Sequence, residues 1–161
     1  MMMLANFIQT SNVPTVEVLQ SSIEKQGFRL TLPSSWNTRS AEAVVAFELA
    51  GGRVDPVYDY DKLEPTFCDI DSFVEDEELD DSMEVRLRTV VGDRTGCLSI
   101  VLAGEPEHAA AGFMLSYCLS KDFDAMCFDA DLMTTNNIEA LTPEALKAEI
   151  TYLVDEHFQT S

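Results

Sequence analysis

The chain has 161 residues, which is enough for one domain with a buried core but short for two. Twenty-nine acidic residues against ten basic ones give a formal net charge of −19 at pH 7. Nucleic acids and anionic membranes bind basic surfaces, so this charge argues against both as direct partners. The hydrophobic share of 46% argues equally against a disordered acidic tail.

The N-terminal region and the cysteines indicate a compartment. No lysine or arginine precedes Lys25, so the basic region of a secretory signal is missing. No apolar run approaches the ~20 residues that a helix needs to span a bilayer. The cysteines form no C-x-x-C pair and lie among apolar residues, as buried free thiols do; they are Cys68, Cys97, Cys118 and Cys127. We therefore expect a soluble cytoplasmic protein with reduced cysteines.

The first sixty residues predict strands around one helix. Val16, Leu19 and Ile23 share one face at helical spacing, and Gly27 is suited to ending that helix. Short apolar or alternating runs predict strands over residues 3–8, 28–32, 42–50 and 54–60, the last two joined by a turn at Gly51 and Gly52.

The second half of the chain predicts a hairpin followed by alternating helices and strands. Met83, Val85 and Leu87 alternate with polar residues, which predicts a strand over 83–88. A glycine-bounded turn at 92–96 and an apolar strand at 97–103 complete the predicted hairpin. The remaining elements are a helix ending near residue 121, a strand at 125–128 and a helix that starts at Thr142-Pro143-Glu144.

This order of elements predicts an α+β fold. We expect a mixed, mostly antiparallel sheet with about three helices packed mainly on one face. No linker interrupts the chain, so residues 1–161 are predicted to form a single domain, with an acidic inserted segment at about 64–81.

The negative charge is concentrated between residues 55 and 84. This stretch holds thirteen acidic residues and a single lysine, Lys62, so it carries −12 of the −19. Two interpretations are open: a solvated acidic loop that keeps the protein soluble, or a surface that docks a basic partner. Aromatic residues lie among the carboxylates, either as anchors in an interface or as contacts that fix the segment to the core.

Under the docking interpretation, the candidate partner-binding residues are the carboxylates of this segment and one aromatic residue. They are Asp59, Asp61, Asp69, Asp71, Phe73, Glu75, Asp76, Glu77, Glu78, Asp80 and Asp81.

Catalytic and metal-binding motifs are weak by comparison. Three D-x-D pairs, at 59–61, 69–71 and 129–131, carry oxygen ligands, but none continues into a calcium-binding EF-hand loop. A pairing of His108 with Cys118 or Cys127 is open, but nothing in the spacing requires it, and the other histidine, His157, lies near the C-terminus. No phosphate-binding or hydrolase motif is present. We expect neither an enzyme nor a cofactor, and a divalent-metal-binding or enzymatic module is the alternative.

A pattern in the C-terminal half is similar to a known group of proteins. An apolar strand, Cys97 to Ala103, leads into a helix rich in small residues, Ala109 to Ser120, and then into a short strand that ends in an acid, Asp124 to Asp129. This order resembles the C-terminal half of small acidic α+β immunity proteins found beside bacterial polymorphic and type VI secretion toxins. The resemblance implies a cytoplasmic, non-enzymatic protein that binds a cognate toxin and blocks its active site.

Charge and resemblance lead to one functional hypothesis. We expect a binding protein that neutralises a basic protein partner, most plausibly an immunity protein acting on a toxin or effector. The alternative from another class is a DNA-mimic inhibitor from a phage or mobile element, which presents carboxylates in place of phosphates.

Overall fold

The described part of the chain is organised around one antiparallel sheet. A computed structural model describes residues 2–28, 30, 32, 48–49, 52–53, 63–102, 106–131, 133 and 138–157. In these residues a four-stranded sheet has the order β4-β5-β1-β6, and every neighbouring pair is antiparallel. Its strands are β1 (Met2–Ile8), β4 (Leu63–Asp69), β5 (Gly96–Leu102) and β6 (Met126–Asp129).

Strand β1 lies inside the sheet and has buried residues on both faces. Leu4 and Ile8 contribute to one apolar cluster, whereas Ala5 and Phe7, which point the other way, contribute to a second. All four are at most 1% exposed. The sheet is therefore covered on both sides, which explains why apolar residues occupy both faces of β1 and only Asn6 interrupts them.

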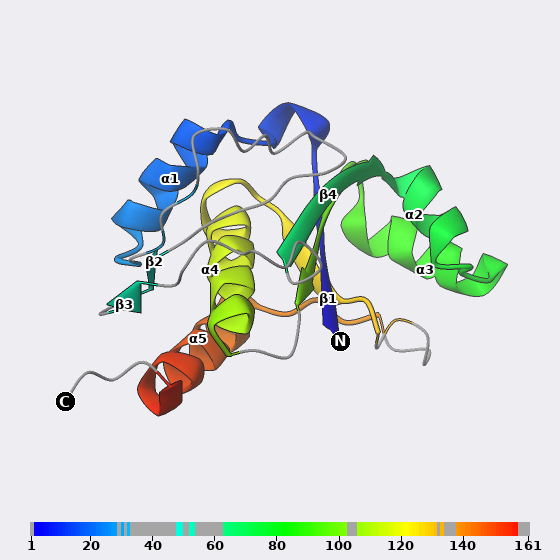
Figure 1. Cartoon of the computed structure of the whole chain (residues 1–161). Helices are drawn as coiled ribbons and strands as arrows, with labels where there is room; N and C mark the ends of the chain where they lie inside the picture. The colour runs from blue at the N-terminus through cyan, green and yellow to red at the C-terminus, as the bar shows by residue number, and fades with distance from the viewer. Residues whose placement is uncertain are drawn as a thin grey trace.

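Helices cover the two faces unequally. On one side lie α1 (Val16–Lys25), α4 (Pro106–Asp122) and α5 (Pro143–His157), and on the other α2 (Ile70–Asp76) and α3 (Asp81–Val91) (Figure 1). A short 3-10 helix, η1 (Thr10–Asn12), precedes α1. The α+β class is thus confirmed, but the described residues form five α-helices instead of about three, and these occupy both faces.

The strand predicted over residues 83–88 is wrong, because these residues belong to helix α3. Met83, Leu87 and Val91 are spaced four apart and are buried, whereas Val85 is 65% exposed, although the strand pattern requires it to be inside. The side chain of Asp80 accepts a hydrogen bond from the Met83 amide at 2.8 Å and so caps the helix. The predicted hairpin is consequently replaced by a helix–turn–strand connection.

The strand predicted over residues 28–32 is not formed by its described residues. Phe28, Leu30 and Leu32 are buried, as the alternating pattern requires. However, the side-chain amide of Gln20 donates to the Leu30 carbonyl at 2.9 Å, and its oxygen accepts from the Leu32 amide at 2.8 Å. A glutamine on α1 therefore takes the place of a neighbouring strand.

Part of the predicted hairpin near the paired glycines is present. Strands β2 (Glu48–Leu49) and β3 (Gly52–Arg53) pair antiparallel with each other. Gly52 thus begins a strand, whereas the sequence predicts it in the turn. The rest of the predicted strand over 42–50 and the whole of the one over 54–60 lie outside the described residues.

Candidate protein-docking surface

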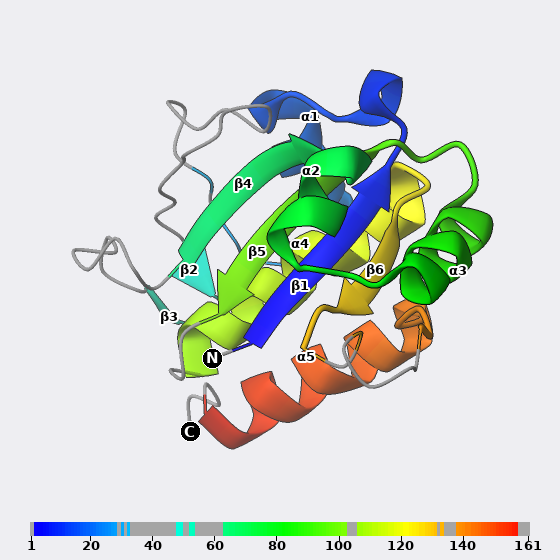
Figure 2. The same ribbon diagram turned by 90° about the vertical axis from the view of Figure 1, so that its right-hand side faces the viewer.

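Residues 70–95, which we call the acidic lobe, form a helical excursion between two neighbouring strands. The chain leaves the sheet at the end of β4 and returns at the start of β5, and the Ile70 amide donates to the Thr95 carbonyl at 2.8 Å where the two ends meet. Figure 2 shows α2 in front of the sheet and α3 beside it. The segment expected as an insertion at about 64–81 thus supplies β4, α2 and the connection to α3.

The lobe is fixed to the sheet by buried apolar side chains. Phe73 is 3% exposed, and its ring meets the edge of Phe7 with 5.0 Å between ring centroids. Arg94, near the end of the lobe, donates to the Asp124 carbonyl at 2.7 Å and pairs with its carboxylate at 3.0 Å. Phe73 therefore holds α2 on the sheet, which agrees with the interpretation that the aromatic residues fix the segment to the core. Because its ring is buried, Phe73 is not part of the docking surface.

Three of the predicted partner-binding carboxylates and their neighbour Glu84 have roles within the fold. Asp69 and Asp80 are the N-caps of α2 and α3, accepting amide hydrogen bonds from Ser72 and Met83, each at 2.8 Å. The backbone hydrogen bond from Ser72 lowers the pKa of Asp69. Another predicted partner-binding residue, Asp71, shares Arg88 with Glu84, whose carboxylate lies 2.9 Å from the guanidinium. These carboxylates therefore make contacts within the fold, although nothing in the sequence distinguishes them from the other acidic residues of the segment.

The remaining carboxylates gather around the end of α2. Glu75, Asp76, Glu78 and Asp81 are exposed, and their side chains have no hydrogen-bond or ion-pair partner among the described residues. The pKa of Glu77 is raised, mainly by burial and then by the negative charges of Asp131 and Asp76. Asp131 follows β6 and was not predicted as part of this surface; only the pairing of β6 with β1 brings it there.

The turn after α2 contains an acid in an unfavourable backbone conformation. The Leu79 amide donates to the Val74 carbonyl and the Glu78 amide to the Glu75 carbonyl, both at 3.1 Å, which is the Schellman arrangement. This arrangement places Glu78 at a φ of 52°, in the left-handed region that glycine or asparagine normally occupies.

Replacing Glu78 by glycine is expected to stabilise the protein. Glycine adopts the left-handed conformation without steric conflict, and the substitution also removes one charge from a crowded surface, so we expect a gain of about 1 kcal/mol in the free energy of unfolding. Urea titration followed by circular dichroism measures it. Glu75→Gly, inside the helix, is the control and is expected to destabilise the protein by a similar amount. A loss of stability in Glu78→Gly would show that the backbone at Glu78 is not strained.

The acidic end of α2 also opposes the helix dipole. The last turns of α1, α3 and α4 contain Lys25, Arg88 and Lys121, which complement the partial negative charge at a helix C-terminus. The last turn of α2 has no basic residue and instead carries Glu75 and Asp76. The lobe therefore combines a rigid support with charges that lower its own stability.

The described residues of the first two D-x-D pairs do not form a group of metal ligands. Asp59 and Asp61 lie outside the described residues, Asp69 caps a helix and Asp71 pairs with Arg88. In the part of the chain that the structure describes, no group of three or more histidine, cysteine or acidic side chains is arranged to hold a metal ion.

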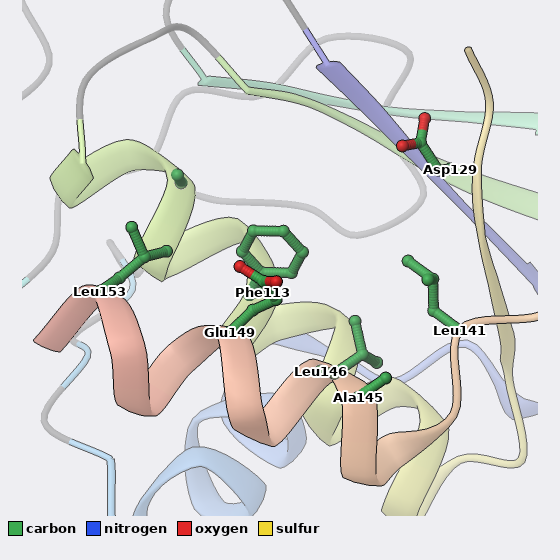
Figure 3. A pocket seen from close by; sticks show the side chains of 8 residues that line it. Phe113, Asp129, Leu141, Ala145, Leu146, Glu149 and Leu153 are labelled. Carbon is green, nitrogen blue, oxygen red and sulfur yellow. The ribbon is translucent and has the colours of Figure 1, made fainter. Parts of the chain in front are cut away.

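A pocket of about 380 Å³ lies between α4 and α5 beside the end of β6 (Figure 3). Among the described residues that line it, only Asp129 and Glu149 are polar, and none carries a hydroxyl, thiol or imidazole group. Burial raises the pKa values of Cys118 and Cys127 to about 12, so both thiols are protonated at neutral pH and are poor nucleophiles. The side chains of both histidines lie outside the described part of the structure.

No protein-family model matches the chain, and searches of curated proteins and of solved structures find no significant match. Among the described helices, none has the length and apolar character needed to cross a membrane.

Proposed function

We propose that this chain is a non-enzymatic binding protein that neutralises a basic protein partner, with the acidic lobe as its docking surface. The observation that supports the proposal most directly is at the end of α2, where Glu75, Asp76 and Glu78 are exposed. Glu75 and Asp76 oppose the helix dipole, and Glu78 has a left-handed backbone conformation that is unfavourable for glutamate. Residues that break local rules of stability are typical of functional sites. A loop that only keeps a protein soluble has no need of the buried contacts beneath this lobe.

The partner proposed is a bacterial toxin or effector, with this chain acting as its cytoplasmic immunity protein. The resemblance of residues 97–129 to such proteins supports this choice, and so does the lobe's charge. Carboxylates held on a rigid support attract the basic residues of a toxin and raise the association rate by about 10- to 1,000-fold. Once bound, the lobe presents its carboxylates to the basic residues of the toxin's active site and blocks it.

Affinity capture with the tagged full chain tests the proposal. We expect one basic protein, encoded beside this chain, to be recovered from a lysate of the producing cells at low salt. At ~0.5 M salt, where the Debye length shrinks to about 4 Å, capture should be much slower. Recovery of no basic protein at either salt concentration would count against the proposal.

The identity of the captured protein separates the remaining functions. A toxin supports the immunity role, whereas a nucleic-acid-binding protein of the host supports the DNA-mimic alternative. Titration calorimetry with calcium and with magnesium tests the metal-binding alternative. Tight binding at a fixed stoichiometry would support it.

A further inference from the structure

Two cysteines face each other at the base of the acidic lobe. Cys68 on β4 and Cys97 on β5 are register partners in the antiparallel pair, one position inside the junction where the lobe leaves the sheet. Opposite residues in such pairs have Cα atoms about 4.5–5.5 Å apart, within the range of about 4.4–6.8 Å seen in disulfides. Both side chains belong to the apolar cluster under α2 and α3, so they lie on the same face of the sheet.

The two thiols differ in exposure and acidity. Cys68 is partly exposed, whereas Cys97 is 0% exposed. A hydrogen bond from the Cys97 thiol lowers the pKa of Cys68, and burial raises the pKa of Cys97 well above its usual value. Cys68 is therefore suited to react first. Cys97 lies directly opposite it in the strand pair and so is placed to resolve the product, although its raised pKa makes this second step the slower one.

We propose that Cys68 and Cys97 form an intramolecular disulfide on exposure to hydrogen peroxide, closing the base of the acidic lobe. The Cys68 thiolate attacks one peroxide oxygen, the O–O bond breaks, and water and a sulfenic acid at Cys68 result once protons are balanced. The Cys97 sulfur then attacks the Cys68 sulfur, the S–O bond breaks, and a second water leaves with the proton of Cys97. Two thiols and one peroxide thus give one disulfide and two waters.

The surroundings of Cys68 select the kind of oxidant. The carboxylates of Asp69, Asp76 and Glu77 all act on this thiol and raise its pKa, so a negative potential surrounds it. A neutral oxidant such as peroxide approaches without repulsion, whereas an anionic disulfide is repelled. We therefore compare the rates at which Cys68 reacts with a neutral dipyridyl disulfide and with a dianionic aryl disulfide. The ratio of the first rate to the second, divided by the same ratio for free cysteine, is expected to be at least about ten, and ~0.5 M salt should lower it.

The test uses the reduced full chain and an excess of hydrogen peroxide. We expect the number of titratable thiols to fall from four to two, with a peptide map that joins the peptides of Cys68 and Cys97. The oxidised protein should melt about 5–10 °C higher, because the bond closes a loop that contains the whole lobe. A folded protein that keeps all four thiols, forms a bond through Cys118 or Cys127, or dimerises through Cys68 would overturn the proposal, as would an unchanged melting temperature after complete oxidation.

Three variants assign the roles of the two cysteines. Cys68→Ser is expected to abolish oxidation, and Cys97→Ala to stop it at a sulfenic acid that dimedone labels at Cys68. Cys118→Ala, a buried cysteine on α4 outside the pair, is the matched control and should form the disulfide as the parent chain does. Label at a residue other than Cys68 in the Cys97→Ala variant would contradict the assignment, and the peptide map of the parent chain decides the case if that variant fails to fold.

Discussion

Replacing Glu75, Asp76 and Glu78 together by lysine is expected to slow association with the captured basic partner about a hundredfold at ~0.05 M salt. All three side chains are exposed around one end of α2, so the reversal changes the local field from attractive to repulsive. Dissociation should change less, because steering acts mainly on encounter. Stopped-flow measurements over a range of salt concentrations separate the two rates.

The same triple variant is expected to make the free protein more stable. Lysines at 75 and 76 complement the helix C-terminus, which is worth about 0.3–1 kcal/mol each. They also remove negative charge beside Glu77, whose pKa is raised partly by Asp76. The melting temperature should rise by about 2–6 °C. Opposite effects on stability and binding are what a docking surface predicts, whereas a solvating loop predicts the gain in stability alone.

Glu24, Glu139 and Glu156 provide a matched control for the reversal. They are exposed, they lie outside the lobe, and their replacement by lysine changes the net charge by the same amount. Glu156 also lies in the last turn of α5, so the control removes an acid from a helix C-terminus as well. The two variants are compared at each salt concentration, and the control is expected to slow association much less than the lobe variant does. At ~0.15 M salt, where the Debye length is about 8 Å, we expect the control to change the association rate less than threefold. An equal slowing in both variants would assign the steering to the overall charge and contradict a localised docking surface.

The elements that could be predicted from sequence are those whose signals agree with one another. The first strand, the helix with Val16, Leu19 and Ile23 on one face, and the helix that begins after Thr142 all occur as expected. In the last of these, the Thr142 hydroxyl accepts from the Ala145 amide at 3.1 Å, as its N-cap sequence predicts. Apolar spacing and capping residues point to the same structure in each case.

Helix α3 was missed because its sequence satisfies two periodicities. Met83 and Leu87 fit a strand face when Val85 is counted with them and a helix face when Val91 is counted instead. Asp80 and the acids of the first turn are helix-start signals, but the alternation of Met83, Val85 and Leu87 with polar residues predicts a strand over the same positions. The core under the lobe decides the outcome, since it buries Val91 and leaves Val85 in solvent.

The composition of the candidate surface could be predicted, but the roles of its members could not. Sequence gives each carboxylate the same chemistry, whereas the fold uses Asp69 and Asp80 as caps and Asp71 as a partner of Arg88. The strain at Glu78 depends on backbone geometry that no composition reveals. Within the described residues 63–84, the structure therefore separates the carboxylates that cap helices or pair with Arg88 from those that are exposed at the end of α2.

Phe73→Ala is expected to have the largest effect of any single substitution in the lobe. The ring is 3% exposed and packs on Phe7, so its removal leaves a cavity between α2 and the sheet and costs about 3–5 kcal/mol. Total stabilities of about 5–15 kcal/mol make this a substantial fraction, with a fall of about 10 °C or more in melting temperature. Thermal unfolding followed by circular dichroism measures the loss.

Phe73→Ala also tests whether a rigid lobe matters for binding, because every carboxylate is retained. If the docking surface must be held in place, this variant should show faster amide exchange throughout α2 and α3 and slower formation of the complex at a temperature where it remains folded. Phe113→Ala is the matched control, since this buried ring on α4 belongs to the cluster on the opposite face of the sheet. It should destabilise the protein without selective exchange in the lobe. Selective loosening of the lobe with unchanged association would show that charge alone recognises the partner and that the support beneath α2 contributes only to folding.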